Sequence, residues 1–342
     1  MDILEINDPT QEQRWDQYAL GKTQTIMDLV GWRHVARDTY GIKSFFLAAV
    51  DNNHIVGTLA LYEIKHPLFG HYLLTAPFGT EGGLLYDSDS ARNLLLEAAR
   101  KLADRHEVDY LVIRLKNNDL HGFTVDHRFC TALITLEPGS DHLWNKRIPS
   151  KTKNQVRKGM KDSFQTDCGN HLVEDFYELI STHMRNLGSP WHGLDFYKNI
   201  VKHMGSRSEF IVIKDGSNLV AGALLFHINQ TVQNVWAIAL NKYNSRCANY
   251  KMYWDFLQDS CRQGYKWFDM GRSIVGSQAM EFKKNWNPDV VPLSYNFYLR
   301  RVKKPPFNDP RNPLFAAPIF VWKKLPLALT RRIGPRLIWG LA

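Results

Sequence analysis

The sequence predicts an α+β protein made of two tandem units, each with a mixed central sheet flanked by helices. Its 342 residues are enough for two domains of ordinary size, and a hydrophobic content of 44% can supply their cores. Phe45 to Ile64 and Glu209 to Ile228 echo each other, because each has a β-rich run, a tight polar turn and a second β-rich run that holds a glycine. Each of the two hairpins that these patterns predict is followed by the same order of strand, helix and strand.

The elements after each hairpin can be placed along the chain. The first hairpin is followed by two extended segments, a helix and a strand, expected at 72–77, 82–86, 90–106 and 110–115. The second is followed by a strand, a helix and a strand, expected at 233–240, 250–263 and 265–270. Polar residues at Asp87 to Ser90 and at Asn249 are the expected N-caps of the two helices. The predicted organisation is an N-terminal unit, a basic linker helix, a C-terminal catalytic unit and a basic amphipathic tail, at 1–138, 139–164, 165–300 and 301–342.

Composition excludes several classes of protein. Met1 to Arg14 is polar and acidic, so no secretory signal is expected. The four cysteines form no C-x-x-C pair and the histidines no H-x-x-x-H pattern, so neither a disulfide framework nor a metal site is expected. The net charge of +9 comes from the end of the chain, because Arg300 to Ala342 holds ten Lys/Arg and one acid, which leaves 33 basic and 33 acidic residues before it. These features favour a cytoplasmic globular protein without a permanently bound cofactor.

The basic tail alternates short apolar runs with paired cations and contains Trp322 and Trp339. Its longest uncharged run is too short for a bilayer, which needs about 20 apolar residues. Cationic amphipathic segments with tryptophans suit the anionic surface of a cytoplasmic membrane leaflet. A tail that packs on the protein with its lysines in water explains the pattern equally well.

A second basic segment lies between the two units. Seven Lys/Arg and no acid occur between His142 and Lys161. Pro149-Ser150 resembles a helix start, which would place Lys153, Arg157 and Lys161 on one face near Lys151. Such a face either lies in solvent or holds the phosphates of a substrate or an RNA.

The stretch Trp267 to Trp286 reads as an apolar strand that turns at Gly271 and leads into a short helix. Asp269 lies among apolar neighbours, where an unpaired carboxylate would be costly. We expect it to brace the turn through an ion pair, to orient Arg272 or Lys283, or to accept a proton from a substrate. Arg272 would bind a phosphate or carboxylate, or pair with Asp269. Ser273 is expected to cap the next helix or to contact substrate, because no G-x-S-x-G pattern supports a nucleophile. The segment also lacks the G-x-x-x-x-G-K-[ST] spacing of a nucleotide phosphate loop.

Several ordered motifs resemble the FemABX group of acyltransferases, and in particular a FemAB-like branch linked to bacterial exopolysaccharide and exosortase systems. The similar stretches, which span nearly the whole chain, are H-P-L-F-G-H-Y-L-L-T-A-P-F-G-T-E-G-G, P-S-K-T-K-N-Q-V-R-K-G, M-R-N-L-G-S-P-W-H, A-N-Y-K-M-Y-W, F-D-M-G-R-S, E-F-K-K-N-W and W-K-K-L-P-L. FemABX members have two units of the GNAT acyltransferase fold and transfer aminoacyl groups to cell-wall precursors. The resemblance therefore implies an activated acyl donor, an amine or hydroxyl acceptor, and chemistry in the C-terminal unit.

The resemblance also implies roles for particular residues. In A-M-E-F-K, Lys283 replaces the tyrosine that many GNAT enzymes use to protonate a thiolate, and a lysine there is expected to stabilise developing negative charge. By the same resemblance, Trp191 and His192 would line an acceptor pocket, and Asn249 and Tyr250 would face the cleft. Asn241 to Tyr250 keeps Arg246 but lacks the glycines that let a GNAT turn bind the CoA pyrophosphate. The expected donor is therefore aminoacyl-tRNA, with acyl-CoA as the alternative.

These inferences predict an acyltransferase or aminoacyltransferase that acts at the cytoplasmic face of the membrane on an envelope glycan, peptidoglycan-type or lipid-linked precursor. Two alternatives remain open. One is an acetyl-CoA-dependent N-acetyltransferase of exopolysaccharide biosynthesis, and the other is a non-catalytic membrane-associated scaffold. The sequence gives no indication of the oligomeric state.

Overall fold

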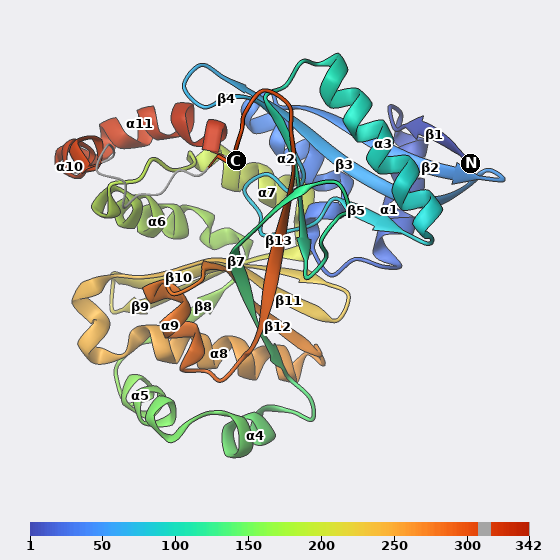
Figure 1. Ribbon diagram of the computed structural model, residues 1–342. Helices are drawn as coiled ribbons and strands as arrows, with labels where there is room; N and C mark the ends of the chain where they lie inside the picture. The colour runs from blue at the N-terminus through green and yellow to red at the C-terminus, as the bar shows by residue number, and fades with distance from the viewer. Residues whose placement is uncertain (307–315, 342) are drawn as a thin grey trace. The chain divides into compact units, whose positions relative to one another are not determined.

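The computed structural model describes residues 1–306 and 316–341 (Figure 1). The chain folds into two compact units. Unit 1 consists of Met1–Phe129, Pro292–Pro310 and Arg336–Ala342, and unit 2 of Cys130–Val291 and Arg311–Pro335. The division falls inside two strands, β7 (Thr124–Thr135) and β13 (Asp289–Leu299).

Unit 1 contains an antiparallel hairpin and helices that pack on its sheet. Its remaining elements are β1 (Asp2–Glu5), α1 (Pro9–Leu20), α2 (Val30–Tyr40), β2 (Lys43–Asp51), β3 (His54–His66), β4 (Gly70–Leu74), β5 (Leu84–Tyr86), α3 (Asp89–Arg105) and β6 (Tyr110–Lys116). Within the unit the strands lie in the order β1-β2-β3-β4-β6-β13. The α3 helix covers one face through a cluster that includes Leu95, which fits against Gly57 of β3.

Unit 2 has the larger number of helices. Its elements are α4 (Ser140–His142), α5 (Ser150–Met160), β8 (Gln165–Cys168), α6 (Val173–Leu187), α7 (Leu194–Met204), β9 (Ser208–Asp215), β10 (Asn218–Ile228), β11 (Thr231–Ala239), α8 (Ala248–Arg262), β12 (Trp267–Ile274), α9 (Gln278–Lys284), α10 (Ala316–Lys324) and α11 (Leu327–Ile338). Its strands lie in the order β12-β11-β10-β9-β8.

The predicted repeat is confirmed strand by strand. In unit 1, β4 is antiparallel to β3 and parallel to β6. In unit 2, β11 is antiparallel to β10 and parallel to β12. In each unit an edge strand and two helices also precede the hairpin, and the edge strands β1 and β8 pair antiparallel to the first hairpin strands β2 and β9. The chain therefore uses one α+β unit twice, as the two echoing hairpins indicate.

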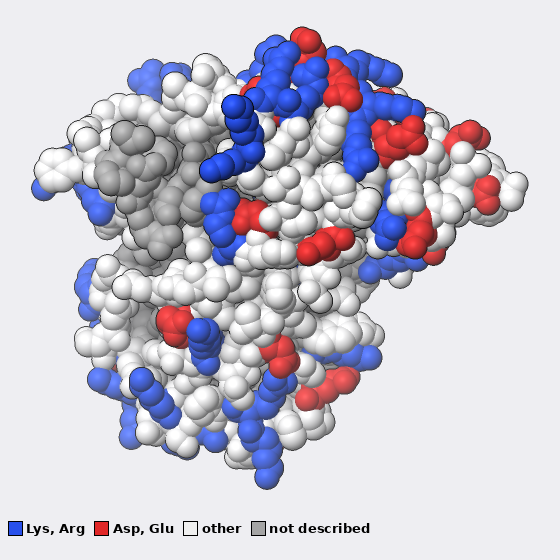
Figure 2. Space-filling view, in the orientation of Figure 1, with Lys and Arg blue, Asp and Glu red and all other residues white. Residues whose placement is uncertain are grey.

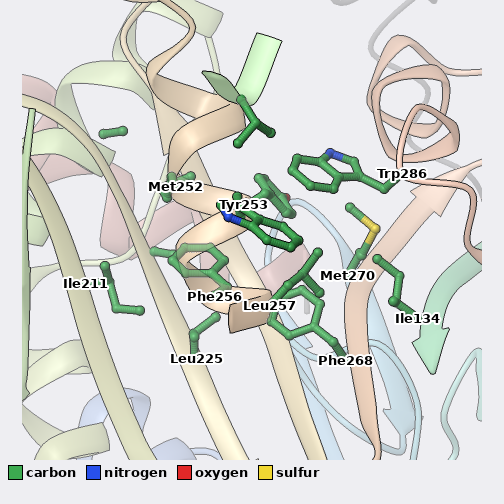
Figure 3. Packing of buried hydrophobic residues seen from close by; sticks show 14 of the residues in the cluster. Ile134, Ile211, Leu225, Met252, Tyr253, Phe256, Leu257, Phe268, Met270 and Trp286 are labelled. Carbon is green, nitrogen blue, oxygen red and sulfur yellow. The ribbon is translucent and has the colours of Figure 1, made fainter. Parts of the chain in front are cut away.

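The core of unit 2 lies between the sheet and α8 (Figure 3). Met252, Tyr253 and Phe256 of α8 contact side chains such as Phe268 of β12. Alternation along β10 sends Ala221 and Ala223 to this face, whereas Gly222 faces α6, where a Cβ would lie 3.0 Å from Leu179. The α6 helix thus covers the opposite face of the same sheet.

The predicted helix caps hold for one helix and fail for the other. Ser88 caps α3 by accepting from the Ala91 amide, within the expected Asp87 to Ser90 segment. The Asn249 cap is wrong, because α8 begins one residue earlier, at Ala248. The chain enters α8 through a 3₁₀ turn and a left-handed residue, Cys247, which makes no side-chain cap. This entry geometry shifts the start of the helix.

The described part of the tail folds back onto the protein. In unit 2, Arg331 of α11 pairs with Glu178 and also donates to Ser181 of α6. In unit 1, the Tyr72 hydroxyl donates to the Gly340 carbonyl, and the Trp339 ring lies 4.6 Å from that of His66. The predicted tail 301–342 includes 307–315 and 342, which lie outside the described residues. In the described ranges, no helix combines the length and the apolarity that a membrane span requires.

Candidate acyl-transfer site in unit 2

The candidate site lies where two parallel strands of unit 2 part. The β11–β12 ladder pairs Thr231 to Gln233 with Trp267 to Asp269, and the described register ends there although both strands continue. On its other side, β11 carries an extra residue, Val235, where the register against β10 shifts. Such bulges bend a strand and re-aim the groups beside it.

Gly271 lies just beyond the last ladder pair, and here the predicted turn is wrong. β12 runs on to Ile274, and the turn follows at Val275 and Gly276. Gly271 instead has a left-handed φ of 78° inside the strand. A Cβ there would come within 3.0 Å of the Asn234 carbonyl oxygen, so only glycine permits this close approach of the two strands.

A buried carboxylate fixes the backbone at Gly271. The Asp269 side chain is fully buried, and its Oδ1 accepts from the Gly271 amide at 2.9 Å and from the Thr131 hydroxyl of β7. A buried carboxylate needs such donors, because an unpaired one would carry a large desolvation cost. Asp269 therefore braces the bend, as one of its expected roles required, and the bonds described here are hydrogen bonds to the Gly271 amide and the Thr131 hydroxyl.

Lys283 reaches the same bend from α9. Its ammonium donates to the Gly271 carbonyl at 2.6 Å and to the Arg272 carbonyl at 3.2 Å, and the residue is 7% exposed. An ammonium has three N–H donors, so one remains without a partner among the described residues. Ser277 starts α9 by accepting from the Met280 amide, so the expectation that Ser273 caps this helix is wrong.

The surroundings of Lys283 lower its pKa and so favour the neutral amine. Burial lowers the pKa of Lys283 to about 8, although the nearby Asp269 carboxylate raises it and the charge of Arg272 lowers it further. The three residues expected to be catalytic, Lys283, Asp269 and Arg272, are thus close enough to influence one another.

Ser273 and Arg272 differ in exposure at the end of β12. Ser273 is 5% exposed, and its hydroxyl has no hydrogen-bond partner among the described residues. The Arg272 side chain is exposed to solvent. A buried hydroxyl without a protein partner can still donate to a ligand, which keeps Ser273 among the candidate binding residues.

Tyr250 and Asn249 lie in the first turn of α8 and are half-buried. The Tyr250 hydroxyl accepts from Asn285, and its ring lies 5.3 Å from Phe282, the residue before Lys283. One turn later, the Tyr253 hydroxyl accepts from the Asn234 amide of β11 at 3.1 Å. Tyr250 of α8 therefore contacts α9 next to Lys283, and Tyr253 of α8 holds Asn234 of β11.

Trp191 and His192 form a separate aromatic cluster on the other side of the β11 bulge. His192 stacks on Phe196 at 4.0 Å, and both Trp191 and His192 contact Trp236, two residues beyond Asn234. Burial lowers the pKa of His192 to about 3, so its ring is neutral and unsuited to bind a phosphate by charge. The tail lies over this loop, since a Cβ on Gly334 would come 2.8 Å from the Trp191 carbonyl.

The basic segment forms the predicted helix, with its cations around one ring. α5 begins at Ser150 after Pro149. Lys153 and Arg157 both lie over the Trp144 ring, at 6.0 and 5.3 Å from its centre. Lys151 is exposed, whereas Lys161 forms the C-cap of the helix. Cations held in this way are pre-positioned on the surface of unit 2.

Arg246 occupies the segment that binds pyrophosphate in ordinary GNAT enzymes, yet it is engaged elsewhere. Its guanidinium pairs with Asp162 and, at 2.6 Å, with Asp215 of the β9–β10 turn. Gly159 of α5 also packs tightly here, because a Cβ would lie 2.7 Å from the Cys247 carbonyl at the start of α8. The entrance to α8 is therefore covered by α5 and closed by an ion-pair clamp.

Sequence reasoning missed Thr131 and Asn234. Thr131 lies 138 positions before Asp269, and a threonine in an apolar strand gives no local sign of this contact. Gln233 and Asn234 did give a signal, because two adjacent amide side chains interrupt an otherwise apolar strand. In the described residues, no group of three or more His, Cys, Asp or Glu side chains is placed to hold a metal ion.

A mixed sheet with α6 and α7 on one face, α8 on the other and a parting between its parallel central strands is the arrangement of the GNAT fold. Residues 150–284 match the family model described as "Acetyltransferase (GNAT) domain". This part of the chain is therefore a GNAT domain, and the enzyme class that it indicates is an N-acyltransferase. No curated protein matches the sequence.

Several solved structures have the same fold over most of the chain. FemX is similar with a TM-score of 0.67 at 14% identity, over 88% of this chain and 98% of that one. The C-terminal domain of a putative lysylphosphatidylglycerol synthetase from Agrobacterium fabrum has a TM-score of 0.56 at 11% identity, over 84% and 91%. A tandem GNAT protein from the clavulanic acid biosynthesis pathway has 0.55 at 10% identity, over 86% and 97%. The predicted two-unit GNAT-like, FemABX-like fold is thus confirmed.

Thr131→Val should destabilise the protein, because Asp269 then loses a hydroxyl donor while its carboxylate stays buried. The expected loss in the free energy of unfolding is about 1–3 kcal/mol, measured by denaturant unfolding. Thr131→Ser keeps the hydroxyl and should lose clearly less. Equal losses in the two variants would show that methyl packing, and not the hydrogen bond, is what Thr131 contributes.

Proposed function

We propose that the protein transfers an acyl or aminoacyl group from an activated carrier to an amine or hydroxyl of a cell-envelope glycan, peptidoglycan-type or lipid-linked precursor, at the cytoplasmic face of the membrane. The observation that carries the proposal is the Lys283 ammonium, which is anchored by two carbonyls and has one N–H left to donate. The FemX likeness and the name of the lysylphosphatidylglycerol synthetase neighbour support this choice of acceptor classes.

In the proposed reaction, the acceptor nitrogen or oxygen attacks the carbonyl carbon of the activated acyl group. The π electron pair of the carbonyl moves to its oxygen and then returns to re-form the C=O bond. As it returns, the C–O bond to the carrier breaks and its electron pair leaves with the carrier oxygen. The acceptor proton ends on that leaving oxygen. Lys283 would donate its third N–H to the developing negative charge, an effect worth a few kcal/mol in comparable sites. Asp269 acts indirectly, by holding the Gly271 backbone whose carbonyl anchors Lys283.

The donor that we favour is aminoacyl-tRNA, held through the basic helix α5. Lys151, Lys153 and Arg157 lie on a helix with no acid, and two of them share the Trp144 ring. The Arg246 clamp and the packing of α5 on α8 argue against a CoA pyrophosphate in its usual place. An acetyl-CoA-dependent N-acetyltransferase of exopolysaccharide biosynthesis is the alternative, favoured by the match to a GNAT acetyltransferase domain.

Lys283→Met should lower the rate of acyl transfer by roughly 100-fold or more while the protein stays folded, because the methionine cannot donate to the oxyanion. Lys284→Met is the matched control, since its side chain is 53% exposed and pairs only with Glu281 among the described residues. Transfer is measured with a soluble acceptor analogue, and folding by circular dichroism. Undiminished transfer in Lys283→Met would remove this lysine from the mechanism, and a wild-type protein inactive with every donor would favour the scaffold.

The rate should fall as pH rises through about 8, because the folded pKa of Lys283 is lowered to that value and the cation is present only below it. Lys283→Arg tests the assignment, since a guanidinium stays protonated across this range. The alkaline limb of the kcat profile should move upward in that variant. A limb that stays near pH 8 would show that another group titrates, and a wild-type rate that rises through pH 8 would indicate a general base instead.

The two donors can be separated by direct binding. We expect tRNA to bind with an affinity that falls steeply with salt, and the paired change Lys153→Gln with Arg157→Gln should reduce the log–log salt slope by roughly 1–2. Lys198→Gln is the control, because Lys198 is a half-exposed cation of unit 2 outside α5. Calorimetry with acetyl-CoA should show no micromolar binding. Micromolar acetyl-CoA binding with an unchanged salt slope for tRNA would favour the acetyltransferase.

A further inference from the structure

Unit 2 exposes several large apolar side chains in the middle of α10 and on the helices α6 and α11. Phe320 is 64% exposed and Val321 56%, and Leu187 at the end of α6 is 53% exposed. Leu329 of α11 is 40% exposed. Phe320, Val321 and Leu187, called the α10 patch below, lie where the tail packs on the end of α6, since Ile319 beside Phe320 contacts Gly188 beside Leu187. Clustered exposed apolar side chains of this size mark interaction sites more often than scattered ones do.

The inner side of α10 is held against the protein, so the outer side is displayed in a fixed orientation. Ile319 lies against Gly188, where a Cβ would come 2.6 Å from its side chain. The Lys323 carbonyl accepts from Arg185 of α6. Trp322 is half-buried, and its indole nitrogen is buried. Phe320 and Val321 are therefore the more exposed residues of α10, and Trp322 lies closer to the protein.

Positive charge surrounds the α10 patch. Lys323, Lys324 and Arg332 are exposed, and the Lys324 ammonium lies 5.8 Å from the centre of the Phe320 ring. No acidic residue occurs in the sequence from Arg311 to Ala342. At the end of unit 2 where Figure 1 places α10, Figure 2 shows uncharged surface with Lys and Arg beside it. Apolar side chains among cations are the composition that binds anionic lipid headgroups and inserts just below them.

We infer that the α10 patch is a docking surface for an anionic lipid leaflet, with Phe320 and Val321 inserted and Lys323, Lys324 and Arg332 on the headgroups. The inference narrows the membrane contact from the whole basic tail to the exposed side of α10, Arg332 of α11 and one residue of α6. The described part of α11 remains engaged with the protein through Arg331 and Thr330. Membrane binding therefore requires no unfolding of the tail.

Docking would also set the position of the Trp191–His192 loop relative to the lipid surface. Leu187 belongs to the patch, and the chain continues directly through Gly188 into the loop that carries Trp191 and His192. The patch thus brings this loop to the lipid surface, where the headgroup of a lipid-linked acceptor would lie. This last step rests on the proposed function, whereas the docking itself does not.

The test uses the full chain and sedimentation with vesicles of phosphatidylcholine that contain roughly a third phosphatidylglycerol, a proportion chosen to give an anionic surface. Phe320→Ser with Val321→Ser should weaken binding by about tenfold or more, because the inserted apolar area is lost. Lys323→Gln with Lys324→Gln should weaken binding to these vesicles and reduce its dependence on salt. Leu68→Ser is the control, since Leu68 is 70% exposed in unit 1, and it should bind as the wild type does.

Two outcomes would overturn the inference. One is a wild-type protein that stays in the supernatant at low salt, and the other is a serine double variant that sediments as the wild type does. If the wild type binds vesicles without phosphatidylglycerol as strongly as vesicles that contain it, the proposed attraction between the cations of the tail and anionic headgroups is wrong. Acyl transfer to a soluble acceptor, measured on the same variants, should be unchanged, so a failure of docking is distinguishable from a failure of the proposed function.

Discussion

The hydrogen bonds of one buried carboxylate determine the geometry at the centre of unit 2. Asp269 lies on the last rung shared by β11 and β12, and it holds the Gly271 amide while Thr131 donates to it. Because the amide of Gly271 is fixed, its carbonyl points to where Lys283 can reach it. Removing Asp269 would free both the Thr131 hydroxyl and the Gly271 backbone. The Gly271 carbonyl could then move away from the Lys283 ammonium, and the pKa of this buried lysine would fall further.

The elements that the sequence predicted well are those specified by local chemistry. Alternating apolar residues around a short polar turn define a hairpin within about twenty positions, and Ser88 caps a helix that starts beside it. The same locality explains the errors at Asn249 and Ser273. Each was a sound cap by residue type, yet the left-handed Cys247 and the continuation of β12 past Gly271 moved the helix starts. A bend that depends on contact with Asn234 of another strand leaves no mark in the local pattern.

The residues of the candidate site also differ in whether a local sequence signal or only a contact between distant residues identifies them. Lys283 was found through a motif, and Asp269 through the cost of a carboxylate among apolar neighbours. Thr131 could not be found, because its hydrogen bond is to a residue far along the chain. Trp191 and His192 were expected around an acceptor pocket. The structure places them in an aromatic cluster beneath the tail, where burial keeps His192 neutral, so their role in binding stays a prediction.

Two features of unit 2 bear on the nature of the leaving group. They are the lysine at position 283 and the contacts that cover the start of α8. A thiolate is a weak base and departs with little help, whereas an alkoxide is far more basic and needs its charge neutralised as the bond breaks. A fixed cation such as Lys283 suits the second case better than a neutral tyrosine does. The Arg246 clamp and the close packing of Gly159 on Cys247 lie in the segment that corresponds to the pyrophosphate-binding turn of ordinary GNAT enzymes, which supports the proposal of a donor other than CoA. Two unrelated features of unit 2 therefore favour an oxygen ester as the acyl donor.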